Sequence, residues 1–160
     1  MKNEVQKPDD ATLILTRLLN APRELAFKAW TSAEHIQQWM RPEPGMTVSH
    51  AIMDARVGGK FRIQMKTPDG EYFTAVGVFK EVKAPERLVY TWDWEKDGGG
   101  TEFGEVEGKP SVVTVEFLKR GELTEMVLMH SRLATVEGRD SHAQGWAKIA
   151  ESFASFVEKQ

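Results

Sequence analysis

Histidines and carboxylates are the side chains of this sequence that could carry acid–base chemistry, and His130 is the strongest candidate. It ends a run in which Met126, Leu128 and His130 alternate along one face of a predicted strand, so we expect its imidazole to point inward. A general acid or base needs a second polar group within hydrogen-bond reach, and no carboxylate stands two residues away on that face. The sequence therefore favours a buried, hydrogen-bonded His130 and assigns no catalytic residue.

The sequence lacks the usual motifs for metals and cofactors. It has no cysteine, and His35, His50 and His142 show neither H-x-x-x-H nor H-E-x-x-H spacing, so no metal site is predicted. A G-x-G-x-x-G fingerprint, a P-loop and a G-x-S-x-G nucleophile motif are also missing, so no cofactor is expected.

Charge and hydropathy exclude several classes of partner. The 160 residues carry a net charge of -3, from 21 Lys and Arg against 24 Asp and Glu, and the basic residues are scattered. Neither nucleic acid nor an anionic membrane surface is therefore expected as a partner. Residues 1–10 are polar, and no apolar run reaches membrane-spanning length. We expect a flexible N-terminus at residues 1–10, one domain at residues 11–160, and a cytoplasmic location.

The elements that must position these side chains are short. Residues 11–19 (ATLILTRLL) predict a strand because they are rich in branched side chains, and residues 22–40 predict two short helices. Clean alternation in residues 60–66 and the turn sequence Pro68-Asp69-Gly70 are typical of antiparallel hairpins. Six strands are expected after the helices, at residues 46–55, 60–66, 71–82, 87–95, 111–119 and 122–133.

The last segment, Asp140 to Gln160, predicts one amphipathic helix. Ser141 and Gln144 have the spacing of a capping box at its start. Its apolar residues recur at helical spacing on one face: Trp146, Ile149, Ala150, Phe153, Phe156 and Val157. A helix with such bulky aromatic residues, following an antiparallel meander, is expected to lie across a curved sheet. The order of elements therefore predicts the α+β class.

Aromatic side chains gather on the inward faces of this predicted arrangement, and large aromatic rings leave irregular space around them. We predict a cavity between the sheet and the C-terminal helix that holds an apolar or amphipathic small molecule. The predicted lining residues are Trp39, Phe61, Ile63, Met65, Tyr90, Trp92, Trp94, Met126, Leu128, His130, Trp146 and Phe153. A closed core made of the same residues is the alternative, because large aromatic side chains stabilise cores without any ligand.

Three surface features have two interpretations each. Val127 and Met129 alternate with the inward residues, so this apolar pair either binds a partner protein or a second copy of the chain, or is covered by a helix. Asp54 and Arg56 share a face, and an ion pair that fixes the following turn is favoured over a functional role. Residues 96–110 form a long loop rich in Gly and acidic residues, which is either filler or a lid.

Several local strings occur in an order and spacing that are typical of one superfamily. They are Ala21-Pro22-Arg23-Glu24-Leu25, residues 31–39, Asp54-x-Arg56-Val57-Gly58-Gly59, Pro68-Asp69-Gly70, residues 85–92 (PERLVYTW), residues 124–130 and Gly145-Trp146. Through these strings the chain resembles the START-like (SRPBCC) superfamily. Within it, the chain is similar to the family named after the C-terminal domain of the activator of heat-shock protein 90 ATPase. The resemblance implies a helix-grip fold, a curved antiparallel sheet wrapped around a long C-terminal helix, with two short helices after the first strand.

The resemblance restricts the fold more than the function, because one fold serves many functions. The superfamily includes lipid carriers, polyketide cyclases and aromatases, hormone receptors and co-chaperone domains. Our first hypothesis is a small-ligand-binding protein. The second is a co-chaperone-like interaction module that stimulates a heat-shock-protein ATPase. It ranks lower because the sequence contains one such domain and no second module to complete a chaperone-binding surface. The third is a cyclase- or hydrolase-like enzyme that uses His130 or a carboxylate in the cavity.

Overall fold

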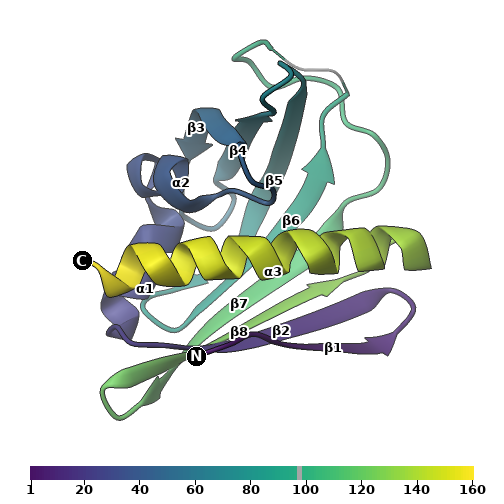
Figure 1. Ribbon diagram of the computed structural model, residues 1–160. Helices are drawn as coiled ribbons and strands as arrows, with labels where there is room; N and C mark the ends of the chain where they lie inside the picture. Colours follow the sequence, from purple (N-terminus) through teal and green to yellow (C-terminus); the bar gives the residue numbers. More distant parts are fainter. Residues whose placement is uncertain (97–98) are drawn as a thin grey trace.

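Figure 1 shows the computed structural model, which describes residues 1–96 and 99–160: a curved sheet with a long helix lying across it. The elements are β1 (Glu4–Asp9), β2 (Thr12–Leu19), α1 (Arg23–Thr31), α2 (Ala33–Trp39), β3 (Thr47–Met53), β4 (Lys60–Lys66), β5 (Tyr72–Lys83), β6 (Arg87–Trp94), β7 (Ser111–Arg120), β8 (Leu123–Ser131) and α3 (Val136–Glu158). Within the described residues, eight strands form one sheet in the order β1-β2-β8-β7-β6-β5-β4-β3. All neighbouring strands are antiparallel. The predicted α+β helix-grip architecture, with a long C-terminal helix and two short helices, is confirmed.

Helix α3 packs on the sheet through the face that its periodicity predicts. Trp146 and Phe153 are 2% and 0% exposed, which confirms their predicted burial. The helix nevertheless begins before Asp140, the predicted start. Thr135 is the N-cap, and its hydroxyl accepts a hydrogen bond from the Gly138 backbone N–H at 2.9 Å. Glycine is a poor helix former, so the presence of Gly138 led to a predicted helix start that is too late in the sequence.

The N-terminal segment contains a strand that the sequence did not predict, because Glu4–Asp9 form the edge strand β1 paired with β2. Asn3 ties this edge to the rest of the fold. Its side-chain oxygen accepts a hydrogen bond from Arg17 Nη1 at 3.0 Å, and its side-chain nitrogen donates to the Ala147 carbonyl of α3 at 2.9 Å. Every residue of β1 is exposed. An edge strand whose side chains are exposed needs no apolar residues, so the composition of Glu4–Asp9 did not indicate a strand.

Trp30 of α1 fills the centre of the core between the sheet and α3. The centroid of its ring lies 4.6 Å from that of Trp39 and 4.8 Å from that of Phe153. Its indole N–H donates to the Tyr90 hydroxyl at 3.2 Å. Burial raises the pKa of Tyr90, so the phenol stays neutral. The Trp30 side chain of α1 therefore occupies part of the space between the sheet and α3.

Val127 and Met129 lie on the other face of the sheet. In β8 they alternate with the buried residues Met126, Leu128 and His130, and both are half-buried. Because α1 packs into the core through Trp30, it lies on the opposite side of the sheet from this pair. The described part of the chain thus leaves an apolar pair partly open to solvent.

Candidate functional site

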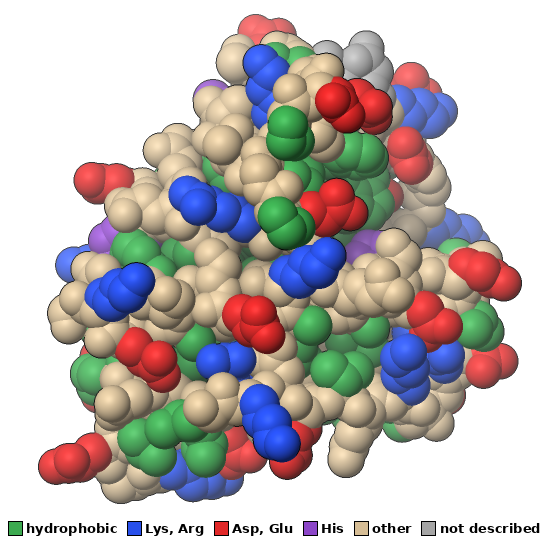
Figure 2. All heavy atoms as spheres, viewed as in Figure 1, with side chains coloured by type: hydrophobic (Ala, Val, Ile, Leu, Met, Phe, Trp, Pro, Cys, Tyr) green, Lys and Arg blue, Asp and Glu red, His purple; other side chains and the backbone are tan. Residues whose placement is uncertain are grey.

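A pocket of about 490 Å³ opens beneath the N-terminal half of α3, between that helix and strands β4, β5 and β6. Figure 2 shows this face of the molecule, on which hydrophobic side chains lie beside a histidine above α3. The apolar floor of the pocket consists of Met46, Met65, Trp92, Trp94, Trp146 and Ile149. Its polar margin consists of Glu43, Glu107, Ser141, His142, Gln144 and Lys148. A second hollow, lined by residues 9–12 and 131–132, is an open surface beside the β1–β2 turn.

The twelve residues predicted to line a cavity divide into two groups. Met65, Trp92, Trp94 and Trp146 line the pocket. The other eight are buried in the core away from it: Trp39, Phe61, Ile63, Tyr90, Met126, Leu128, His130 and Phe153. Trp30 packs against Trp39 and Phe153 in that core, whereas the pocket opens at the β4–β6 end of the sheet.

Several pocket residues were missed by the sequence reasoning. Tyr72 and Phe73 at the start of β5 line the pocket, and Phe73 is 46% exposed. His142 also lines it, one helical turn before Trp146. Residues four apart on a helix share a face, so the position of His142 was available from helical periodicity. For Phe73 the sequence offered no signal beyond its apolar side chain, because its exposure depends on the surrounding loops.

His130 takes part in a chain of hydrogen bonds that determines the position of every proton. The indole N–H of Trp146 can only donate, and it donates to His130 Nδ1 at 2.9 Å. The proton of the neutral ring must then be on Nε2, which donates to Ser111 Oγ at 2.6 Å. The Ser111 hydroxyl in turn donates to the Trp92 carbonyl at 2.9 Å. A general base would have to accept a hydrogen bond from the serine hydroxyl, whereas His130 donates one to it. The direction of this hydrogen bond is therefore the reverse of that between a nucleophilic serine and its base.

The surroundings of His130 agree with a structural role. Burial first, and the nearby His142 second, hold the pKa of His130 well below its usual value, so the ring is neutral. A catalytic His130 would need an acid beside it, and neither Asp54 nor Glu116 fills that role. Asp54 is bonded to Arg56 at an exposed site, and Glu116 pairs with Arg87. The structure therefore agrees with the buried, hydrogen-bonded His130 that the sequence favoured.

His142 connects this chain of hydrogen bonds to the pocket. Its Nδ1 lies 2.7 Å from the Gly138 carbonyl, and its Nε2 accepts a hydrogen bond from Trp94 Nε1 at 3.3 Å. The centroids of the His130 and His142 rings are 4.9 Å apart. Burial lowers the pKa of His142, against the opposing effect of the Gly138 carbonyl. The pocket wall thus contains a neutral imidazole with both nitrogens engaged.

Trp92, which lines the pocket, carries a buried polar atom that differs from those of the other tryptophans. Trp92 is 3% exposed, and its indole N–H is buried without a partner among the described residues. The indoles of Trp30, Trp39, Trp94 and Trp146 all donate to protein acceptors. A buried donor without an acceptor costs about 1–3 kcal/mol, so this N–H lowers the stability of the fold.

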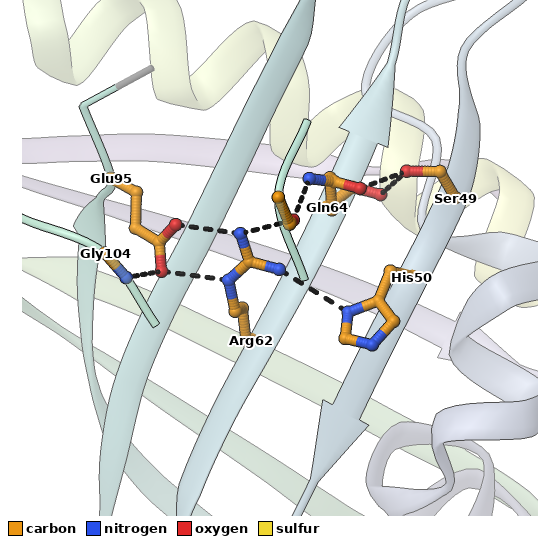
Figure 3. Close-up of polar contacts among 7 residues, drawn as sticks. Ser49, His50, Arg62, Gln64, Glu95 and Gly104 are labelled. Carbon is orange, nitrogen blue, oxygen red and sulfur yellow. Dashed lines mark hydrogen bonds and ion pairs between the residues drawn. The ribbon is translucent and has the colours of Figure 1, made fainter. Parts of the chain in front are cut away.

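A buried ion pair lies on the outer face of the same strands (Figure 3). Arg62 of β4 binds Glu95, which follows β6, through Nε to Oε2 and Nη2 to Oε1, both at 2.9 Å. The two side chains are 1% and 4% exposed. Burial alone would raise the pKa of Glu95, but hydrogen bonds from Arg62 and from the Gly104 backbone N–H lower it below the ordinary value. Glu95 is therefore ionised at neutral pH.

The polar contacts continue onto β3. Arg62 Nη1 lies 3.4 Å from His50 Nδ1, and Ser49 Oγ donates to Gln64 Oε1 at 2.8 Å. Gln64 Nε2 then donates to the Gly100 carbonyl at 2.7 Å. These contacts place part of the predicted 96–110 loop against the sheet; residues 97 and 98 of that loop lie outside the described residues.

Two further properties bear on function. Among residues 1–96 and 99–160, no three His, Cys, Asp or Glu side chains are grouped so that they could hold a metal ion. In the same residues, no helix has the length and apolar character needed to span a bilayer.

Comparison with known proteins gives a consistent result. The family model described as Activator of Hsp90 ATPase homolog 1-like protein matches residues 20–158. A crystal structure of a Rhodobacter sphaeroides protein is similar over 100% of both chains, with 19% identity and a TM-score of 0.82. The AHSA1 protein from Silicibacter pomeroyi is 24% identical over 91% of this chain and 96% of that one, with a TM-score of 0.78. A Chromobacterium violaceum protein is 21% identical over 92% of this chain and 97% of that one, with a TM-score of 0.80. No curated protein sequence matches the chain.

Proposed function

This chain belongs to the family of Activator of Hsp90 ATPase homolog 1-like proteins, and we propose that it binds an apolar or amphipathic small molecule in the pocket beneath α3. The pocket itself carries the proposal. Its volume of about 490 Å³ lies within the range of about 300–1,000 Å³ that is typical of small-molecule sites. A buried apolar floor beside an exposed polar margin suits a ligand that has one apolar and one polar end.

The polar groups of the pocket support an amphipathic ligand. Glu107 and Lys148 at the margin are exposed and can contact the polar end of a ligand while keeping their own hydration. His142 remains neutral and has both nitrogens engaged, so it contributes a flat wall.

Binding is favoured over catalysis because His130, which is hydrogen-bonded to Ser111, has its proton on the nitrogen that faces the serine. Ser111 receives a hydrogen bond from His130, where a nucleophile would have to donate one. Both side chains are also buried behind Trp92 and Trp146 rather than on the pocket wall. The arrangement suits a rigid scaffold for the pocket.

The test is binding of dodecanoate, dodecanol and naphthalene, read by tryptophan fluorescence and by thermal unfolding. Trp92, Trp94 and Trp146 all line the pocket, so a bound probe should change their emission. A ligand at a hundred times its Kd stabilises the folded state by about 2.7 kcal/mol, which is readily measured. If none of the three probes shifts the emission or the melting temperature, the proposal is wrong.

Gly145 provides a variant that should block the pocket. It lies on the pocket wall in α3, and a Cβ built on it meets only Pro42 Cβ, at an ordinary 3.6 Å. Gly145→Leu should therefore fill the pocket, and it should also favour the helix, because glycine is the weaker helix former. Ser155→Leu, at an exposed position of the same helix, is the matched control. We expect Gly145→Leu alone to abolish probe binding.

A second candidate function is an interaction module that stimulates a heat-shock-protein ATPase. The half-buried apolar pair Val127 and Met129 on the outer face favours it, and so does the name of the family. The test is the ATPase rate of such a chaperone with and without this protein. Val127→Lys should reduce any stimulation while probe binding stays unchanged. An ATPase rate that does not respond to the protein would exclude this candidate.

A further inference from the structure

Segment 99–107 is bound to the sheet at two points by the buried ion pair. Arg62 Nη2 donates to the Gly100 carbonyl at 3.0 Å, and the Gly104 backbone N–H donates to Glu95 Oε2 at 3.0 Å. Figure 3 shows Arg62 and Glu95 side by side, with the Gly104 backbone next to the Glu95 carboxylate. Both charged side chains therefore contact the segment as well as each other.

The same segment leads to the pocket. The Glu107 backbone N–H donates to the Trp94 carbonyl at 2.9 Å, and Val106 forms a β-bridge with Glu95. Glu95, Glu107 and Trp94 all line the pocket. We propose that Arg62 and Glu95 are positioning residues of the ligand pocket, which hold segment 99–107 so that its last residue, Glu107, stays in the pocket wall. This inference rests on the proposed function.

Positioning explains why charges are used at this site. A buried ion pair is weak evidence of stabilisation, because well-packed apolar side chains of similar volume often stabilise a fold equally well or better. Apolar side chains could not accept a hydrogen bond from the Gly104 N–H or donate one to the Gly100 carbonyl. The guanidinium can bind Glu95 with two of its donors and still direct another hydrogen bond to Gly100.

The double variant Arg62→Met/Glu95→Met separates positioning from stability. It removes both charges together and fills their space with unbranched apolar side chains, so the melting temperature should stay close to that of the wild type. Segment 99–107 loses both bonds to the pair, so its backbone amides should exchange hydrogen for deuterium faster. The affinity for dodecanoate should fall by roughly 3- to 30-fold, the range of effect of mutations on coupling networks.

Arg87→Met/Glu116→Met is the matched control. This pair also joins an arginine to a glutamate, at 3.0 Å, but both side chains are more than one-third exposed. Neither residue lines the pocket or contacts segment 99–107. Exchange in segment 99–107 and the affinity for dodecanoate should both match those of the wild type.

The outcomes distinguish this inference from the proposed function. If the wild type and the Arg62→Met/Glu95→Met variant bind dodecanoate equally, the positioning role is wrong and the pocket remains a binding site. If the wild type binds none of the probes, both proposals fall. If the double variant does not fold, Arg62→Lys decides, because it keeps the charge but not the planar fork. Weaker binding by Arg62→Lys at an unchanged melting temperature supports the inference, and equal binding overturns it.

Discussion

Replacing His130 tests the hydrogen-bond chain beside the pocket most directly. The side chain accepts from Trp146 Nε1 at 2.9 Å and bonds to Ser111 Oγ at 2.6 Å, and none of the three residues is more than 7% exposed. His130→Ala leaves the Trp146 N–H buried without an acceptor, which costs about 1–3 kcal/mol. The space left by the imidazole adds a cavity penalty. We expect the free energy of unfolding to fall by about 2–5 kcal/mol in all.

Trp146→Phe separates the lost hydrogen bond from the cavity. It removes the N–H donor and keeps an aromatic ring, so in its presence His130→Ala no longer leaves a donor unpaired. The double variant should therefore lose about 1–2 kcal/mol less than the sum of the two single variants, within the usual range for contacting residues. Trp39→Phe is the control, because the Trp39 indole donates to the Ala29 carbonyl instead. Its effect should add to that of His130→Ala within about 0.5 kcal/mol.

The assay is equilibrium unfolding in urea, followed by circular dichroism so that the loss of a tryptophan does not change the signal. The dependence of the unfolding free energy on urea concentration should be the same in all variants, which shows that the folded and unfolded states keep their exposed areas. Strict additivity of His130→Ala and Trp146→Phe would refute the reasoning, because it would mean that this hydrogen bond contributes nothing measurable. A loss below about 0.5 kcal/mol for His130→Ala would refute it as well.

Two further predictions concern stability. Burial lowers the pKa of both His130 and His142, so the unfolded chain takes up protons more readily than the folded one. The free energy of unfolding should therefore have its full value above about pH 6.5, the ordinary pKa of histidine, and decrease below that pH. The decrease should be up to about 1.4 kcal/mol per pH unit for each histidine. Urea unfolding at a series of pH values measures this, and equal stability at about pH 7 and pH 5 would contradict it. Phe153→Ala should cost about 3–5 kcal/mol because the ring is enclosed beside Trp30, whereas Val5→Ala at the exposed edge should be nearly neutral. A loss below about 2 kcal/mol for Phe153→Ala would mean that the ring borders an existing void.

Local periodicity in the sequence was sufficient for the elements and their faces. Alternation along β8 indicated that His130 points inward, and helical spacing indicated that Trp146 and Phe153 face the sheet. These properties depend on neighbours within a few residues, so a single sequence contains them. Arg17 shows the limit of such reasoning. Both faces of its strand carry apolar residues, so alternation does not show which face Arg17 is on. The structure shows that its guanidinium bonds to Asn3, which precedes β1.

What covers each face was decided by the tertiary structure alone. Arg62 and Gln64 occupy the polar phase of β4, which predicts exposure, yet they are 1% and 3% exposed. Segment 99–107, more than thirty residues further along the chain, brings Gly100 onto them. In the same way, the sequence could not show that Trp30 would pack in the middle of the core and that the pocket would open at the β4–β6 end of the sheet. Periodicity determines the direction of a side chain, but its burial depends on which distant segment packs there, and that follows from the free energy of the whole fold.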